Sequence, residues 1–230
     1  MPSLGFRKQE LERIKTKRVL VVCEGEEKCS EHLYLWLYKQ IFKLENFYIE
    51  IVPCGKKSDF HHITQKALEC INKSERNPYT HVFCVADADN EEEKYKKVVE
   101  KIEELKQQCD KQEVRVEVRA IISNPCFEFW ILLHFCYTTA FFKNDKDLKR
   151  GIDCQLNKSK KSEKYQKCDP KLYKTIVERH EIALKNAEQV QQVQKQNNES
   201  KNYPNPSTQF NDLIRFLNSL KENSLKECRF

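Results

Sequence analysis

The chain has 230 residues, of which 33% are charged and 39% are hydrophobic, and its formal net charge is +6. This length suits one large domain, or one domain with a helical appendage, and it allows roughly 70–75% of the unfolded surface to be buried. With only four glycines, the sequence nearly excludes a glycine-rich phosphate-binding loop. All apolar runs are far shorter than the roughly 18 residues of a membrane-spanning helix, so we expect no membrane partner.

Eleven cysteines are present, but none form a C-x-x-C pair, and no two histidines have the spacing of a zinc site. Several cysteines lie in apolar runs, where a free thiol acts as a small hydrophobic side chain. The N-terminal residues also lack the pattern of a signal peptide. We therefore expect reduced thiols and a cytoplasmic location.

The first part of the chain alternates between two hydrophobic patterns. Short apolar or alternating runs predict strands at 19–23, 47–52, 81–86 and 114–122. Apolar residues at helical spacing predict helices at 30–42, 58–73, 91–108 and 126–136, the last with Pro125 in its first turn. This alternation predicts an α/β fold, with a mostly parallel sheet flanked by helices. In such a sheet the carboxyl ends of the strands share one edge, where ligands bind.

The character changes after about residue 140. Residues 143–168 are rich in lysine and are expected to form a loop with one short helix. An apolar stripe predicts one long helix over 169–193, and a last helix is expected over 206–220, after a linker at 195–205. We therefore expect an α/β domain at 15–140 and a C-terminal helical region at 141–225 that packs on it.

Acidic residues follow two of the predicted strands. Glu24 and Glu26 come after the first strand, and Asp87 and Asp89 come after the third. Residues i and i+2 of an extended chain face the same way, so the two aspartates are expected to point together into one crevice, with Glu24 close by. Clustered carboxylates repel one another, and a hard cation such as Mg²⁺ or Mn²⁺ relieves that repulsion. The alternative is that Asp89 or Asn90 only caps the helix that follows.

A further acid, Glu128, lies in the otherwise apolar predicted helix at 126–136. A buried glutamate is rare unless it is paired or ligates a metal, so Glu128 is a further candidate ligand. The alternative is an ordinary capping or partly exposed glutamate. Asn124, just before this helix, is a candidate either for capping it or for contacting a substrate.

Three of these strings resemble a known family. E-G-E after the first strand, D-x-D after the third and SNPCFEFWILLHF after the fourth resemble the RloB-like proteins, bacterial accessory proteins of restriction and abortive-infection loci. KSKKSEKYQK and NPSTQF also fit that family, so the resemblance covers roughly residues 15–220. RloB-like proteins are similar to the Toprim superfamily, whose members cleave or rejoin nucleic-acid phosphodiesters with Mg²⁺.

This resemblance implies a Toprim-like fold, with Glu24 as the general acid or base and Asp87 and Asp89 as metal ligands. It also implies a partner ATPase and a role in antiphage defence. The chain departs from the family pattern at Ala88, where relatives often carry arginine between the aspartates. It reads EGEEKCSEHLY where relatives commonly read E-G-E-K-T-E, and PCGKKSDF where they have a glycine-rich loop.

Two functions stay open on this evidence. The first is a metal-dependent nuclease that hydrolyses DNA or RNA, with tRNA among the candidate substrates. The second is a non-catalytic component that binds nucleic acid or the ATPase. A HAD-type phosphatase is disfavoured because its D-x-D follows the first strand, and a P-loop NTPase because CGKKS retains only the end of that motif.

A nucleic-acid substrate would need positive side chains for its phosphates. Taken singly, each lysine is more simply a solvated side chain, and only the clustering of lysines favours a binding role. The candidates are Lys56, Lys57, Lys158, Lys160, Lys161, Lys164 and Lys167. Self-association into a homo-oligomer is also left open.

Overall fold

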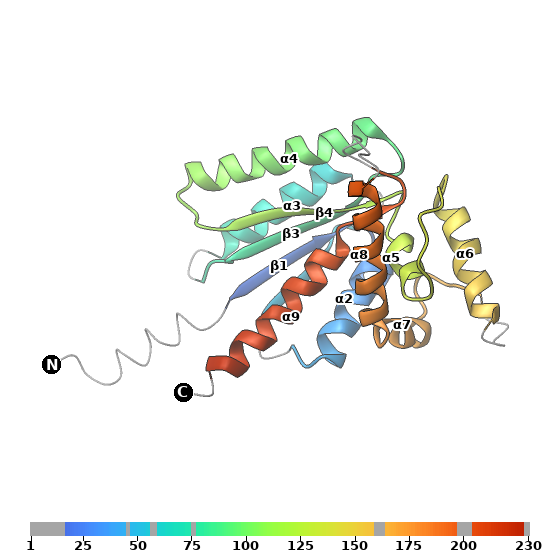
Figure 1. Ribbon diagram of the computed structural model, residues 1–230. Coiled ribbons are helices and arrows are strands. Elements are labelled where there is room, and N and C mark those ends of the chain that lie inside the picture. Colours follow the sequence, from blue (N-terminus) through green and yellow to red (C-terminus); the bar gives the residue numbers. More distant parts are fainter. Residues whose placement is uncertain are drawn as a thin grey trace.

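A computed structural model describes residues 17–44, 47–55, 59–74, 77–158, 164–196 and 204–227 (Figure 1). The strands are β1 (Arg18–Cys23), β2 (Tyr48–Pro53), β3 (His81–Asp87), β4 (Glu117–Asn124) and β5 (Ser207–Thr208). The helices are α2 (Ser30–Ile41), α3 (Phe60–Lys73), α4 (Glu92–Lys111), α5 (Glu128–Leu133), α6 (Asp145–Lys158), α7 (Pro170–Val177), α8 (His180–Gln196) and α9 (Phe210–Glu227). Strands and helices alternate from β1 to α5, as the sequence predicts.

The strands form a five-stranded sheet in the order β2-β1-β3-β4-β5. β1 is parallel to its neighbours β2 and β3, and β3 is parallel to β4. β5 runs antiparallel to β4, with Ser123 opposite Thr208. The predicted α/β class with a mostly parallel sheet is therefore confirmed, and the carboxyl ends of β1, β3 and β4 share one edge.

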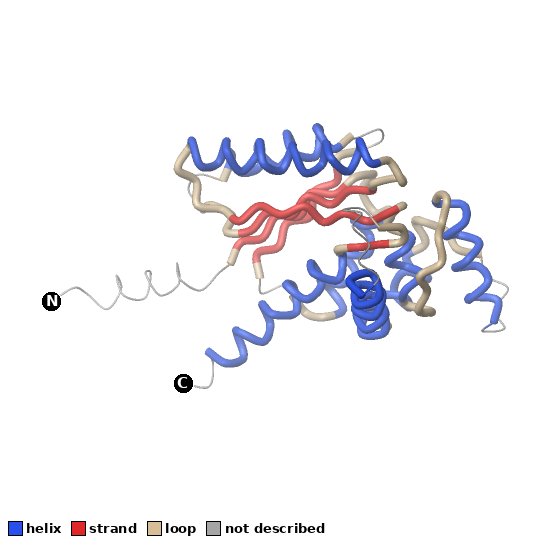
Figure 2. The backbone as a smooth tube through the Cα atoms, turned by 45° about the horizontal axis from the view of Figure 1, so that its top comes forward, coloured by secondary structure: helices blue, strands red, loops and turns tan. Residues whose placement is uncertain are grey.

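Helices cover both faces of this sheet (Figures 1 and 2). On one face, Leu20 and Val22 of β1 belong to a core shared with α3 and α4. On the other face, Val19 and Val21 belong to a larger core shared with α2 and α5 to α9. Successive side chains of a strand point to opposite faces, so the continuous apolar run of β1 supplies both cores.

The C-terminal helices share the larger core with the sheet. Phe210, at the start of α9, is fully buried, and its ring lies 5.0 Å from Phe127 and 5.5 Å from both Trp130 and Tyr34, measured between centroids. The Tyr34 hydroxyl lies 2.9 Å from Nε2 of His134, and burial lowers the pKa of His134 to about 3. A neutral imidazole thus joins this aromatic group, and the C-terminal helical extension is packed on the α/β core.

Three predicted helices differ from those observed. The helix expected at 126–136 is limited to α5, and Pro125 precedes it instead of lying in its first turn. The lysine-rich region contains the 14-residue helix α6 where only a short one was expected. The single helix expected over 169–193 is two helices, α7 and α8, although no glycine or proline marks the break.

Two further features lie in the last part of the chain. The two-residue strand β5 falls within the range predicted to be helical, because a strand this short has no detectable period. α8 extends to Gln196, and most of the expected linker, 197–203, lies outside the described residues. Within the described ranges, no helix combines the length and the apolar character that crossing a bilayer requires.

Candidate functional site

The loops that follow β1 and β2 meet at the carboxyl edge of the sheet. Gly25 and Gly55 pair across these loops, and the Gly55 N–H donates to the Gly25 carbonyl at 2.7 Å. Both have φ of +90°, a conformation that favours glycine because it has no Cβ. This pairing fixes the chain immediately after Glu24.

Glu24 and Asp87 lie side by side at this edge, as the strand-end argument predicts. The Glu24 N–H donates to the Val85 carbonyl at 3.3 Å, and the Asp87 N–H donates to Oε2 of Glu24 at 3.5 Å. Oδ1 of Asp87 also accepts a hydrogen bond of 2.9 Å from the Phe127 N–H, just before α5. Asp87 thus joins the ends of β1 and β3 through its backbone N–H, and joins them to the start of α5 through its carboxylate.

Two buried glutamates complete a group that we call the acidic cluster: Glu24, Glu31, Asp87 and Glu128. Glu31 in α2 is 4% exposed, and Glu128 in α5 is 1% exposed. Burial, followed by the charges of Glu31 and Glu128, raises the pKa of Asp87 well above its ordinary value. Burial and the nearby Glu128 and Glu24 raise the pKa of Glu31 to about 8, and burial raises the pKa of Glu24 against the influence of Lys94. Such shifts are common where carboxyl groups are held together for function.

Two lysines neutralise part of the charge at this edge. Nζ of Lys167 lies 2.9 Å from Oε1 of Glu128, and Nζ of Lys94 lies 2.5 Å from Oδ2 of Asp89. Burial opposes the charged form of each lysine, but the facing carboxylates raise the pKa of both. Lys94 and Lys167 therefore stay protonated and neutralise the Asp89 and Glu128 carboxylates with which they pair.

The expected geometry of the D-x-D pair is wrong in one respect. β3 ends at Asp87, and Asp89 has φ of +51°, so the chain is not extended between the two aspartates. The Asp89 side chain is 53% exposed and is bonded to Lys94. Asp89 is nevertheless close enough for its charge to raise the pKa of Asp87 and of Glu24.

A segment before α7 contacts the acidic cluster at Glu128. The Tyr165 hydroxyl lies 3.4 Å from Oε1 of Glu128 and 2.7 Å from the Tyr173 hydroxyl. The Ser30 N–H donates to the Lys167 carbonyl at 3.1 Å, which joins the segment to the start of α2. These contacts place the lysine-bearing segment against the acids rather than in open solvent.

A disulfide between Cys29 and Cys168 fastens this segment to the loop before α2. The expectation that the thiols are all reduced is therefore wrong at these two positions. The two cysteines are 139 residues apart in the sequence, and only the packing of α7 against α2 brings them together. The remaining cysteines within the described ranges are free thiols.

Of the other predicted site residues, the structure describes Glu26 and Asn124 but not four of the lysines. Glu26 is exposed on the turn after β1, and its role as a ligand stays a prediction. Asn124 is buried: its Oδ1 accepts from the Asn90 N–H at 3.0 Å and its Nδ2 donates to the Pro204 carbonyl at 3.1 Å. Asn124 thus positions the loop after β3, and a contact with substrate is untested. Four of the predicted lysines lie outside the described residues: Lys56, Lys57, Lys160 and Lys161.

Sequence reasoning did not single out Glu31 or Lys94. The signal for Glu31 is present, because it is an acid in the first turn of a mostly buried helix, which is the argument used for Glu128. Lys94 carries no such signal, because one lysine among many on an exposed helix looks like a solvated charge.

The acids of this edge suit a hard divalent cation by their chemistry. Oxygen ligands are those that Mg²⁺ and Mn²⁺ prefer. Burial first, and then the neighbouring carboxylates, raise the pKa values of Asp87 and Glu31, and a cation would relieve the repulsive part of this effect. As the side chains stand, no group of three or more histidine, cysteine, aspartate or glutamate residues in the described part of the chain is arranged to hold a metal ion.

The fold and this edge define an α/β protein with partly buried carboxylates at the carboxyl ends of parallel strands and two buried glutamates on the adjoining helices. The sequence model of the RloB-like proteins matches residues 19–217, and the chain belongs to the RloB-like protein family. Comparisons with curated proteins and with solved structures give no match.

Proposed function

We propose that this protein is a metal-dependent nuclease that hydrolyses phosphodiester bonds in DNA or RNA, with a Toprim-like site at the acidic cluster. The observation that carries the proposal is the convergence of Glu24, Asp87 and Glu128 from three separate elements at one edge of the sheet. Membership of the RloB-like family, and the likeness of that family to Toprim proteins, support the same chemistry.

Asp87, Asp89 and Glu128 are the residues that would hold Mg²⁺ or Mn²⁺, with Glu26 as a further candidate. Such a metal polarises the phosphoryl group and stabilises charge on the leaving oxygen. Glu24 would move the proton, because burial raises its pKa toward neutrality and lets it act as a general acid or base. Described lysines near this edge, such as Lys164, would contact phosphates of the substrate.

The proposal includes a partner and a setting. By the family resemblance, the nuclease would act with an ATPase in a bacterial antiphage or abortive-infection system, in the cytoplasm. Activity would depend on that partner if the ATPase repositions the segment that carries Lys167, since this segment contacts Glu128 of the acidic cluster.

The nuclease proposal is tested by incubating the purified chain with DNA, tRNA and other RNA, with and without Mg²⁺ or Mn²⁺, alone and with the ATPase. Glu24→Gln and Asp87→Asn should each abolish metal-dependent cleavage. Glu27→Gln, an exposed glutamate on the same turn, is the matched control and should leave cleavage unchanged. Cleavage that survives Asp87→Asn would show that another site or a contaminant is responsible.

The second candidate is a non-catalytic component that binds nucleic acid or the ATPase. The lysine pairing of Glu128 and Asp89 favours it, because both carboxylates are already neutralised without a metal. In that case the chain would bind nucleic acid or the ATPase equally well with and without Mg²⁺, and Asp87→Asn would leave binding unchanged.

A further inference from the structure

The disulfide between Cys29 and Cys168 adjoins one of the two ion pairs at the acidic edge. Cys29 is the N-cap residue of α2, and Cys168 directly follows Lys167, whose Nζ lies 2.9 Å from Oε1 of Glu128. The Ser30 N–H donates to the Lys167 carbonyl at 3.1 Å, next to the bridge. The state of this covalent bond therefore bears directly on how firmly Lys167 is held at Glu128.

The other contacts that hold this segment at Glu128 are noncovalent. The Lys167 side chain is 39% exposed, and solvent weakens an ion pair formed by a partly exposed lysine. The Tyr165 hydroxyl reaches the same Glu128 oxygen at 3.4 Å, which is long for a hydrogen bond between oxygens. Breaking the disulfide leaves the segment with contacts of this kind, so Lys167 should then leave Glu128 more easily.

A reductant can reach the disulfide from solvent. Cys168 is exposed whereas Cys29 is partly buried, so an incoming thiolate attacks the sulfur of Cys168 and releases Cys29 as a thiolate. The N-terminus of α2, a helix of 12 residues, favours a negative charge at its N-cap. This position makes Cys29 a good leaving group and favours reduction of the bond.

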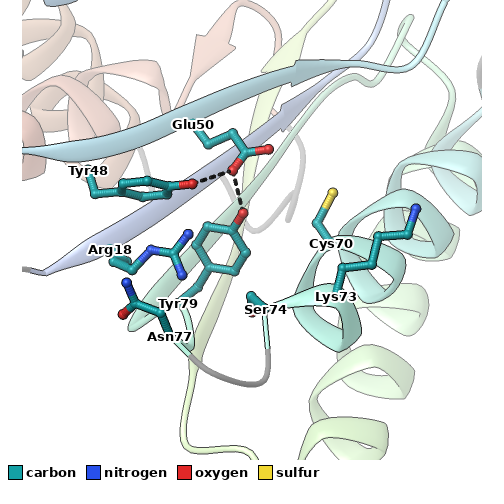
Figure 3. A pocket seen from close by; sticks show the side chains of 8 residues that line it. All are labelled: Arg18, Tyr48, Glu50, Cys70, Lys73, Ser74, Asn77 and Tyr79. Atoms are coloured by element: carbon teal, nitrogen blue, oxygen red, sulfur yellow. Dashed lines mark hydrogen bonds between the residues drawn. The ribbon is translucent and has the colours of Figure 1, made fainter.

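Several free thiols of the chain compete poorly in such an exchange. Burial raises the pKa of Cys54 to about 11, and it also raises the pKa of Cys23 and Cys84. Burial likewise raises the pKa of Cys70, which lies on the wall of a cavity of about 470 Å³ (Figure 3). A thiol that is rarely ionised reacts slowly, so these cysteines do not readily exchange into the bridge.

We propose that Cys29 and Cys168 form a reversible thiol–disulfide site, and that its reduction by a dithiol releases Lys167 from Glu128. In this exchange the first thiolate of the dithiol forms a mixed disulfide with Cys168, and Cys29 leaves and takes up a proton. The second thiol of the reductant then displaces Cys168, so the dithiol becomes a disulfide and both cysteines become thiols. If the proposed function holds, on which this step rests, the freed Glu128 carboxylate makes the acidic cluster a better cation site.

The first test compares the backbone motion of the oxidised and the reduced protein by NMR relaxation, without metal. Dithiothreitol reduces the full chain and is removed under argon, and mass spectrometry of alkylated thiols confirms each form. On reduction, the order parameters of Gln166 and Lys167 should fall from about 0.85 to below about 0.6. Leu20 and Val82, which are buried in the sheet, are the reference and should stay near 0.85 in both forms.

The second test is calorimetric titration of both forms with Mn²⁺. The reduced wild type should bind Mn²⁺ at least about fivefold more tightly than the oxidised form. In Lys167→Met the two forms should differ by less than about twofold, because no lysine competes for Glu128. Lys171→Met removes an exposed lysine of α7, and Cys154→Ser removes an exposed free thiol. Both of these control variants should keep the difference of the wild type.

The two tests separate this proposal from the proposed function. Order parameters of Gln166 and Lys167 that do not change on reduction overturn the proposal, and so does a fall that extends to the sheet, because the disulfide would then hold the whole fold. Equal Mn²⁺ affinity of the two wild-type forms, or a redox difference that persists in Lys167→Met, refutes the release of Lys167. If neither form binds Mn²⁺, the metal site of the proposed function fails, and the relaxation measurement alone decides on the thiol–disulfide site.

Discussion

Replacing Glu31 by glutamine should change how the stability of the protein depends on pH. Burial and the charges of Glu128 and Glu24 raise the pKa of Glu31 from its ordinary value of 4.5 to about 8. Between these two values the folded protein holds a proton on Glu31 that the unfolded chain has released. Rising pH therefore favours the unfolded chain through this group, and its stabilising effect is complete only below about pH 4.5. Glutamine has nearly the same shape and does not titrate, so the variant loses this dependence.

The size of the effect follows from the gap between the two pKa values. Each pH unit corresponds to about 1.4 kcal/mol, so a gap of about 3.5 pH units amounts to about 5 kcal/mol between pH 4.5 and pH 8 as an upper limit. Even a third of this is large against a total stability of about 5–15 kcal/mol. We expect Glu31→Gln to match the wild type near pH 5 and to be more stable by several kcal/mol at pH 8.

The measurement is urea denaturation followed by circular dichroism at one-unit steps from pH 5 to pH 9, without divalent metal. Glu100→Gln removes an exposed glutamate of α4 and should follow the wild type at every pH. If the difference in unfolding free energy between wild type and Glu31→Gln is constant across this range, Glu31 is not protonated in the folded protein. The description of the edge as a group of mutually repelling carboxyls would then be refuted.

Three further outcomes follow from the contacts at the site and in the core. Lys167→Met removes the positive charge that pairs with the buried Glu128 carboxylate. It should lower the unfolding free energy by about 1–3 kcal/mol, a moderate loss because Lys167 is itself partly exposed. Mg²⁺ should restore this loss if the acidic cluster binds it, and Lys164→Met is the control. Cys168→Ser should lower the unfolding free energy by about 2–5 kcal/mol, because the disulfide closes a loop of 139 residues. A reducing agent should bring the wild type down to the level of that variant and leave the variant unchanged. Phe210→Ala should cost about 3–5 kcal/mol by denaturation, because the ring is fully buried; a loss below 1 kcal/mol would mean that α9 is not packed as described.

Most of the fold could be predicted from hydrophobic periodicity. The run of β1 is apolar at every position because it supplies two cores, and this pattern is typical of a parallel strand covered on both sides. The break between α7 and α8 could not be predicted, because the apolar stripe continues through Glu178 and Arg179 without a residue that disfavours helix. β5 was missed because two residues contain no period, and only the edge of β4 makes them a strand.

Part of the candidate site could likewise be predicted from the sequence, and part of it depends on contacts between distant segments. Parallel strands place Glu24 and Asp87 at one edge whatever the loops do, so the shared edge of the strand ends was enough to predict that they lie close together. Lys167 and Cys168 reach that edge only because α7 packs against α2, which depends on contacts between distant parts of the chain. No property of the local sequence marks them, and the same holds for the pairing of Cys29 across 139 residues.

Protons, lysines and a divalent cation are alternative ways to relieve the same repulsion, and they must compete. In the structure described here, Lys167 neutralises Glu128, while Asp87 and Glu31 favour their protonated forms. A cation that binds among these carboxylates must therefore release protons and weaken the hold of Lys167. Because the disulfide at Cys168 keeps Lys167 close to Glu128, the ion pair between Lys167 and Glu128 would form again whenever the metal leaves. Affinity for the metal should thus rise with pH, and metal occupancy should be coupled to the position of the segment that carries Lys167.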